Sequence, residues 1–196
     1  MILLKEKFRN TRIILASGSP RRKYLLGEIG IDFEVIENTD MDETYPGSLS
    51  GKEIPVFLAN KKSEVRKNLL IGDVLLITAD TIVWCDKKVL NKPAGRNDAI
   101  KSLLTLSGRS HEVISGVCLR SREKTVSFSS VTSVSFRKLK EDEIVYYVDT
   151  CRPYDKAGAY GIQEWIGYIG IESITGSYFN VMGLPVDKLY RNLECF

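Results

Sequence analysis

The sequence has 196 residues, of which 43% are hydrophobic and 27% charged, and it carries a formal net charge of +3. A chain of this length can bury a sizeable core, so we expect a single domain over residues 1–196, with room for two lobes. The mild positive charge does not indicate nucleic-acid binding, which is typical of domains with a pI above about 9 and clustered basic residues.

The cysteine spacing and the hydropathy pattern indicate that the protein is located in the cytoplasm. Four cysteines lie far apart and there is one histidine, so no group has zinc-ligand spacing and we expect reduced thiols. Residues 1–5 turn polar too soon for a signal peptide, and no apolar run approaches the ~18 residues of a membrane span. We therefore expect a cytoplasmic protein without a membrane partner.

Segments with strand and helix patterns alternate along the chain. Strands are predicted at residues 12–16, 33–36 and 74–79, and as an alternating pair within 111–136 that turns at 121–124. Helices are predicted at residues 20–29, 53–69, 97–106 and 141–148, and after Pro185. Ser19 and Asn97 are the expected N-caps, and an acidic loop is expected at 40–43. This mixture predicts an α/β or α+β fold around one largely mixed sheet.

The turn at residues 17–22 has the features of an anion site. A strand end, a small-residue turn and a helix start bring free backbone N–H groups and the positive end of the helix dipole together. Arg21 and Arg22 stand in the first helical turn, where the dipole favours acidic residues, and a phosphate ligand would resolve that conflict. A capped amphipathic helix with two solvated arginines explains the segment equally well.

Two charged residues interrupt apolar patterns. Lys62 lies on a helical stripe with Leu58 and Val65, where a lysine either extends to the solvent or faces a cleft that holds an anion. Asp80 ends a buried strand pattern, beyond which α/β proteins often bind ligands. A carboxylate there can hold a metal or act as a base on water, and the alternative is an aspartate bound by nearby backbone N–H groups.

Other candidate residues carry little weight alone. Lys92 and Gln163 stand in turn-rich loops and are ordinary surface residues by themselves, although a glutamine amide can read a base edge. The sequence contains neither a P-loop nor a GxGxxG fingerprint. A Ser–His–Asp or Cys–His mechanism would depend on His111 alone, for which we favour a structural role.

Together these segments resemble the Maf family of septum formation inhibitor or nucleotide pyrophosphatase proteins. The matching motifs occur in the family's order over nearly the whole chain. They are residues 15–22 (LASGSPRR), 58–62 (LANKK), 79–83 (ADTIV), 91–93 (NKP), 106–109 (LSGR), 155–163 (DKAGAYGIQ) and 176–185 (GSYFNVMGLP). Any one of them can arise by chance, whereas the ordered set is specific.

The resemblance implies an ITPase-like (Maf/HAM1) α/β fold, with an elongated mixed sheet flanked by helices and two lobes around a cleft. It also implies hydrolysis of a nucleoside triphosphate to the monophosphate and pyrophosphate with the help of Mg2+ or Mn2+. Asp80 would be the catalytic carboxylate that activates water. The positions that would hold the triphosphate are Ser17, Arg21, Arg22, Lys62 and Lys92.

Further positions concern the base and the metal. Arg21, Thr81 and Gln163 match positions that the family associates with base choice, and a Thr after the Asp with a later Gln resembles the branch acting on dTTP and UTP. Glu43 stands where family members carry an acidic residue near the metal, so Glu43 and Asp80 are the expected metal ligands. We expect a nucleotide partner and no nucleic acid, and we leave a homodimer open.

The chain departs from the family pattern at two places. Cys151-Arg152-Pro153 stand where Gly-Glu-Pro is frequent, and Glu164 follows Gln163 where glycine is usual, which can reshape the loop over the base. Modified pyrimidine nucleotides therefore remain candidate substrates. Three other functions stay open: a nucleotide-binding regulator of septum formation without essential catalysis, a 7-methyl-GTP-type pyrophosphatase, and a phosphatase that releases orthophosphate.

Overall fold

Three long strands form the middle of the sheet in the computed structural model, which describes residues 3–37 and 42–196. They are β3 (Val74–Cys85), β5 (Ser110–Arg120) and β6 (Thr125–Phe136). The strand order is β2-β1-β3-β5-β6-β7, and β4 pairs with the last residues of β3. Strand β1 pairs in parallel with β2 and β3, whereas β4 and β7 pair antiparallel with β3 and β6. The sheet is therefore mixed, as the sequence predicts.

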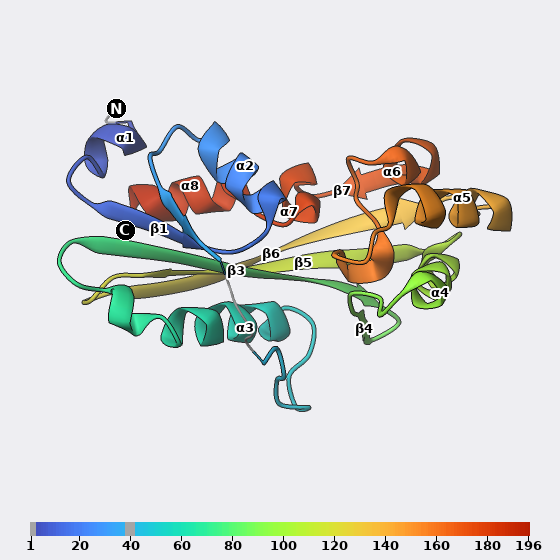
Figure 1. Ribbon diagram of the computed structural model, residues 1–196, viewed down its shortest axis with the longest axis horizontal. Helices are drawn as coiled ribbons and strands as arrows, with labels where there is room; N and C mark the ends of the chain where they lie inside the picture. Colours follow the sequence, from blue (N-terminus) through green and yellow to red (C-terminus); the bar gives the residue numbers. More distant parts are fainter. Residues whose placement is uncertain (1–2, 38–41) are drawn as a thin grey trace. The chain divides into compact units, whose positions relative to one another are not determined.

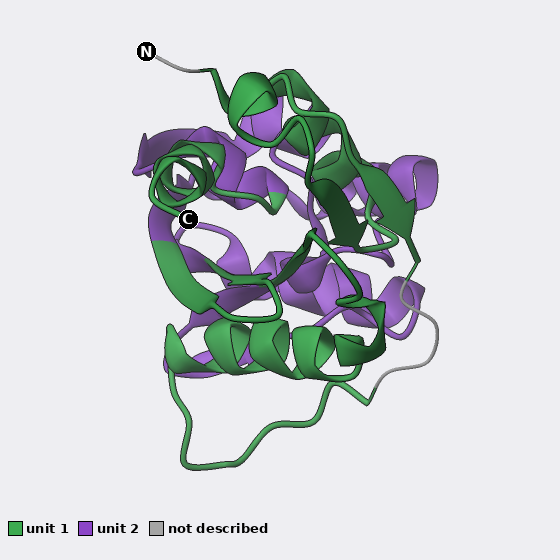
Figure 2. Cartoon of the chain, turned by 90° about the vertical axis from the view of Figure 1, so that its left-hand side faces the viewer, with its two compact units in different colours: residues 1–80, 115–130, 183–196 green, residues 81–114, 131–182 purple. Residues whose placement is uncertain are grey.

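The chain divides into two compact units, which Figure 2 shows in different colours. Unit 1 consists of Met1–Asp80, Ser115–Ser130 and Gly183–Phe196, and unit 2 of Thr81–Ile114 and Val131–Met182, so that β3, β5 and β6 contribute to both. The other elements of unit 1 are α1 (Leu4–Lys7), β1 (Arg12–Ala16), α2 (Pro20–Glu28), β2 (Glu34–Ile36), α3 (Glu53–Glu64), η1 (Lys67–Leu69) and α8 (Val186–Glu194). Those of unit 2 are β4 (Lys88–Leu90), α4 (Arg96–Leu106), α5 (Glu141–Cys151), η2 (Ala157–Ala159), α6 (Trp165–Gly170), β7 (Ile171–Thr175) and α7 (Tyr178–Met182).

Helices cover both faces of the sheet in unit 1. Helix α3 lies on one face, and α2 and α8 lie on the other (Figure 1). The last four residues of β1 are buried, as expected for a strand that is covered on both faces. Ile14 and Ala16 of β1 form one core cluster with Val74 and Leu76 of the neighbouring parallel strand β3.

The helix ends agree with the sequence in α2 and differ in α3. Ser19 is the N-cap of α2, and its Oγ accepts a hydrogen bond from the Arg22 backbone N–H at 3.5 Å. The spacing of residues 53–69 predicts one helix, but α3 ends at Glu64 and the separate 3-10 turn η1 follows. The last turn tightens because the Val65 N–H bonds to the carbonyls of Lys61 and Ser63, and the Val65 side chain is exposed.

The start of α4 also differs from the prediction. The helix begins at Arg96 with Gly95 as its N-cap, so the predicted N-cap Asn97 lies inside the helix. The Arg96 Nε donates to Asp149 Oδ1 of α5 at 2.6 Å, which fixes the first turn of α4. This partner is far away in the sequence, so the local capping pattern could not reveal it.

No helix in the described part of the chain is long and apolar enough to cross a membrane.

Strand β3 is longer than its apolar run. The sequence predicts that the strand ends at Ala79, whereas β3 continues to Cys85. Thr81, Ile82 and Val83 have β-branched side chains that favour the extended backbone, and Val83 pairs with Leu90 of β4. Asp80 therefore lies in the middle of a strand and not beyond its end, which corrects the expected position of this carboxylate.

Strands β5 and β6 confirm the strand pair predicted within residues 111–136, and the backbone N–H of Ser121 bonds to the Lys124 carbonyl in the turn between them. The predicted alternation holds in β6, whereas residues 113–119 of β5 are all buried, as in a strand that is covered on both faces. The glycine-rich stretch before α8 is more ordered than its composition suggests, because it contains α6, β7 and α7. Each of these has six residues or fewer, which is too short to show a clear periodicity.

His111 belongs to an aromatic cluster in the core of unit 2. Its Nε2 and the Tyr160 hydroxyl are 2.7 Å apart, and its ring stacks on Phe136 with the centroids 5.6 Å apart. Burial lowers the pKa of His111 from 6.5 to about 4. The folded protein therefore holds this imidazole in its neutral form, in keeping with a structural role.

Replacing Gly116 in β5 with alanine should destabilise the protein. The added Cβ would lie 2.3 Å from the Pro55 carbonyl carbon and 2.4 Å from the Val56 nitrogen, which are backbone atoms of α3. We expect the free energy of unfolding, measured by urea denaturation, to fall by about 2–3 kcal/mol. The matched control is Gly27→Ala in α2, where an added Cβ meets nothing within 4 Å, so stability should not fall. Equal stability of Gly116→Ala and wild type would contradict the close approach of α3 to β5.

Protonation of His111 should destabilise the fold in acid. Because its pKa is lowered in the folded state, the unfolded chain binds a proton first as the pH falls from 6.5 to about 4. The resulting loss in free energy of unfolding over this window should reach about 2–3 kcal/mol. Urea titrations across the window should show a shallower decline in His111→Leu, and identical declines in the two proteins would disprove this assignment.

Candidate functional site

Unit 1 contains a buried ion pair between α3 and β3. The Lys62 ammonium of α3 binds the Asp80 carboxylate of β3, with Nζ 2.6 Å from Oδ1. Lys62 is 4% exposed and Asp80 7%. Lys62 Nζ also lies 2.8 Å from Oε1 of Glu43, whose side chain is 47% exposed. Either charge would be costly to bury alone, so each depends on the other for its place in the fold.

The packing of α3 against the sheet makes this contact possible. The Thr78 hydroxyl of β3 donates to the Ala59 carbonyl of α3 at 2.7 Å, one helical turn before Lys62. The missing side chain of Gly116 leaves room for the α3 backbone at Pro55. Lys62 therefore reaches the strand instead of extending to the solvent, which is the less common of the two outcomes for a lysine on an apolar stripe.

The turn between β1 and α2 is linked to the same part of β3. Ser17 is buried, and its Oγ accepts hydrogen bonds from the Ser19 backbone N–H at 3.3 Å and from Arg22 Nη1 at 3.4 Å. Arg22 Nη1 also donates to the Ala79 carbonyl, and Arg22 Nε to the Gly183 carbonyl, each at 2.9 Å. Arg22 thus connects the turn, the residue before Asp80 and the segment before α8.

The electrostatics of Arg22 follow from this position. Burial lowers the pKa of its guanidinium, and the nearby carboxylates of Asp80 and Glu43 act in the opposite direction, while the positive charge of Arg21 lowers it further. Arg22 and the two carboxylates are therefore close enough to affect one another. This cluster of two carboxylates and several cationic groups within one unit is the candidate functional site.

The predicted site residues divide between the two units. Unit 1 contains those joined by the contacts above, together with Arg21, which precedes Arg22 on α2: Ser17, Arg21, Arg22, Glu43, Lys62 and Asp80. Unit 2 contains Thr81, Lys92 and Gln163. Thr81 follows Asp80 directly, and Lys92 is exposed in the loop after β4. Their participation in the same site remains a prediction.

Two features of unit 2 bear on Gln163. Its Oε1 is buried and has no hydrogen-bond partner among residues 3–37 and 42–196. The next residue, Glu164, binds Lys156 and the Tyr147 hydroxyl. The sequence marks Glu164 only as a departure from the family pattern, and it gives no signal for Tyr147, which lies in α5.

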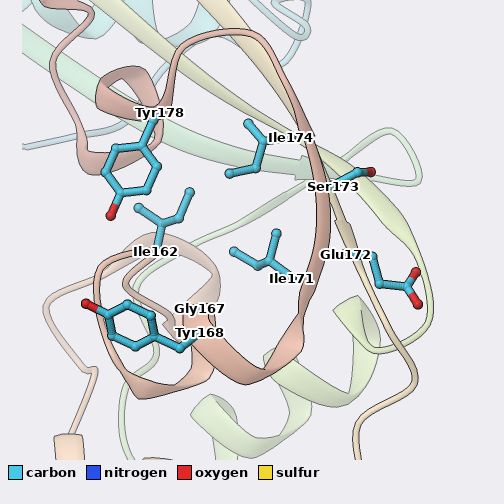
Figure 3. Close-up of a pocket in the computed structure, with 8 residues that line it drawn as sticks. All are labelled: Ile162, Gly167, Tyr168, Ile171, Glu172, Ser173, Ile174 and Tyr178. Atoms are coloured by element: carbon cyan, nitrogen blue, oxygen red, sulfur yellow. The ribbon is translucent and has the colours of Figure 1, made fainter.

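Unit 2 also contains a shallow hollow of about 340 Å³ (Figure 3). Tyr168 and Tyr178 line it with Ile162 between them, and Ile171 and Ile174 lie to one side of these three residues. Glu172 is the charged residue of this described lining, which has no lysine or arginine. An apolar hollow with a single carboxylate does not suit a triphosphate, so we do not place the phosphate site there.

A solved structure has the same type of fold. The HAM1 protein from Coxiella burnetii matches with a TM-score of 0.51 over 95% of this chain and 100% of that chain, at 15% sequence identity. At this identity the likeness concerns the fold alone. It confirms the prediction of an ITPase-like α/β fold in which helices flank a mixed sheet.

Residues 12–196 match the family described as Maf-like protein, and the chain belongs to this family. A protein from Bacteroides fragilis is 57% identical over 183 residues, which cover 93% of this chain and 95% of that protein. Proteins from Parabacteroides distasonis and Porphyromonas gingivalis are 53% and 47% identical, and each alignment covers at least 97% of both chains. All three relatives are named dTTP/UTP pyrophosphatase.

Removing the lysine of the buried pair should lower the stability of the folded protein. Lys62→Met leaves the Asp80 carboxylate buried without its ammonium partner, so we expect the free energy of unfolding to fall by about 3–5 kcal/mol. The double variant Lys62→Met/Asp80→Asn removes both charges and should recover part of that loss in a urea titration. The neighbouring Lys61→Met is the control, because its partner Asp42 is mostly exposed and the pair should contribute less than about 1 kcal/mol. Equal effects of the two lysine variants would contradict the buried pair.

Proposed function

We propose that the protein is a nucleoside triphosphate pyrophosphatase that converts dTTP and UTP into the monophosphate and pyrophosphate. The observation that carries this proposal is the buried Lys62–Asp80 pair, which has Glu43 and Arg22 beside it in one unit. The names of the three relatives support the substrate class. Modified pyrimidine nucleotides are further candidate substrates of the same site.

Cationic groups and backbone donors would bind the triphosphate. A triphosphate carries about four negative charges, which the protein must offset before chemistry can occur. Arg21, Arg22 and Lys62 supply positive charge in unit 1, and we assign Lys92 to the same task. Ser17 and the backbone N–H groups at the start of α2 would add hydrogen bonds to phosphate oxygens.

The chemistry we assign to Asp80 is the activation of water. Lys62 binds Oδ1 of this carboxylate, and we assign Oδ2 to the attacking water. The water oxygen forms a bond to the α-phosphorus while the bond from that phosphorus to the bridging oxygen breaks. Pyrophosphate leaves with the electron pair, and the proton of the water passes to Asp80 and then to solvent.

The carboxylates present fit a divalent metal. No group of three or more His, Cys, Asp or Glu side chains in the described parts of the chain is arranged to hold a metal. Mg2+, however, is usually held by one or two carboxylates together with substrate phosphates. Glu43 and Asp80 meet at the same ammonium group, and they would hold Mg2+ or Mn2+ with phosphate oxygens. The metal would supply charge neutralisation on the phosphates.

Base choice is assigned to Arg21, Thr81 and Gln163. The buried Oε1 of Gln163 has no donor in the described chain, and an N–H group of a base would satisfy it. The threonine after Asp80 and the glutamine at 163 resemble the branch of the family that acts on dTTP and UTP, which supports these substrates over 7-methyl-GTP. We expect the protein to act in the cytoplasm, in keeping with its four free cysteines, and a homodimer remains a prediction.

A product assay with an Asp80 variant tests this proposal. Wild type with Mg2+ should release pyrophosphate and no orthophosphate from UTP and dTTP. Asp80→Asn should lower kcat by about 10²–10⁴-fold, because it removes a group that acts in the transition state. The control is Asp32→Asn, which changes an exposed carboxylate that pairs with Lys5 and should leave kcat unchanged.

Two outcomes would contradict the proposal. Orthophosphate as the product would favour a phosphatase, and near-normal turnover by a folded Asp80→Asn would remove this residue from the mechanism. A purely regulatory nucleotide-binding protein would bind the nucleotide in both forms without any turnover.

A further inference from the structure

A charged cluster in unit 2 lies beside Gln163. The carboxylate of Glu164 pairs with Lys156 through Oε1, at 3.0 Å from Nζ, and accepts a hydrogen bond from the Tyr147 hydroxyl through Oε2. Lys156 and Tyr147 are both buried. Burial raises the pKa of the Tyr147 phenol, and the neighbouring Glu164 raises it further, so the phenol stays protonated and donates to the carboxylate.

The same contacts fix the backbone on both sides of Gln163. The Gly161 N–H donates to the Tyr147 hydroxyl oxygen at 3.1 Å, and the Glu164 N–H donates to the Gly161 carbonyl at 3.0 Å. The Glu164 carbonyl accepts from the N–H of Gly167 at 2.8 Å, which joins the loop to α6. Gln163 therefore stands in a short loop that is held by a buried tyrosine and a buried lysine.

The amide of Gln163 itself lacks one partner. Its Oε1 is buried, and no residue of the described chain donates to it. A buried acceptor without a donor destabilises a protein by about 1–3 kcal/mol and calls for an explanation. An N–H group of a bound base would remove this penalty, provided that the loop holds the amide in one orientation.

We propose that Glu164 is a positioning residue that sets base selectivity through Gln163. This inference rests on the proposed function and concerns its substrate choice. Uracil and thymine carry a hydrogen on N3 that a carbonyl oxygen can accept, whereas the N3 of cytosine is itself an acceptor. A loop that holds the Gln163 oxygen in place therefore favours UTP and dTTP over CTP and dCTP, because a mismatched base leaves buried polar groups unpaired.

The test compares kcat/KM for pyrophosphate release from UTP and from CTP. In Glu164→Gln, Lys156 loses one of its two carboxylate partners and keeps Asp155, whose Oδ1 lies 2.7 Å from Nζ, while the side chain at 164 keeps its size. We expect the UTP/CTP ratio to fall by about tenfold, through a higher KM for UTP, with kcat on UTP changed by less than about threefold. The control with the same chemical change in the same unit is Glu172→Gln, an exposed residue of β7, which should keep the wild-type ratio.

A second variant, Gly161→Ala, tests the position of the Glu164 carboxylate by steric displacement. An added Cβ at Gly161 would lie 2.7 Å from Cδ of Glu164 and displace the carboxylate from its partners. Gly161→Ala should therefore lower the ratio in the wild-type background. It should have no further effect in Glu164→Gly, where the displaced group is absent. Tyr147→Phe, which removes the hydrogen bond to the same carboxylate and the one from the Gly161 N–H, should also lower the ratio.

The outcomes separate the two proposals. If wild type releases pyrophosphate but the ratio stays unchanged in folded Glu164→Gln and Tyr147→Phe, the positioning role is wrong and the pyrophosphatase stands. Equal losses of kcat/KM on both nucleotides would also overturn it, because they would indicate a purely structural role. If wild type releases no pyrophosphate from any nucleotide, the proposed function fails, and the positioning role fails with it.

Discussion

A lysine and an aspartate that are almost completely removed from solvent bind each other in unit 1, and the proposed chemistry depends on this contact. A buried ion pair contributes little net stability, because desolvation of both charges offsets most of their attraction. Its presence is therefore better explained by function than by folding. The small residue Gly116 and the Thr78–Ala59 hydrogen bond allow α3 to carry its lysine to the strand.

The turn before α2 serves the fold and the proposed site at once. Ser17 and Arg22 bind each other, and Arg22 also binds the carbonyl before Asp80 and the carbonyl of Gly183. The guanidinium is thus held by the protein while its charge remains next to the carboxylates. This arrangement is preorganised, so an anionic substrate would meet fixed charges and would not have to order them.

The sequence predicts much of this from local signals. The N-cap of α2, the alternation in β6 and the anomaly of Lys62 on an apolar stripe all depend on neighbours within a few residues, and the structure has each of them. The extension of β3 through Asp80 and the start of α4 differ from the prediction. The apolar run that marks β3 ends at Ala79 although the strand continues to pair with β4, and Arg96 at the start of α4 binds Asp149, which is far away in the sequence. The Lys62–Asp80 contact joins two elements, so spacing alone could suggest each charge but not the pair. The acidic loop predicted at 40–43 lies partly outside the described residues.

In the proposed reaction water attacks the α-phosphorus beside Asp80, and transfer of oxygen from labelled water identifies the phosphorus that is attacked. UTP or dTTP is hydrolysed by wild type in 18O-labelled water, and the products are separated and weighed by mass spectrometry. Attack at the α-phosphorus gives one labelled oxygen in the nucleoside monophosphate and none in pyrophosphate. Label in pyrophosphate, or in orthophosphate released from the γ-position, would place the attack at another phosphorus and rule out this mechanism.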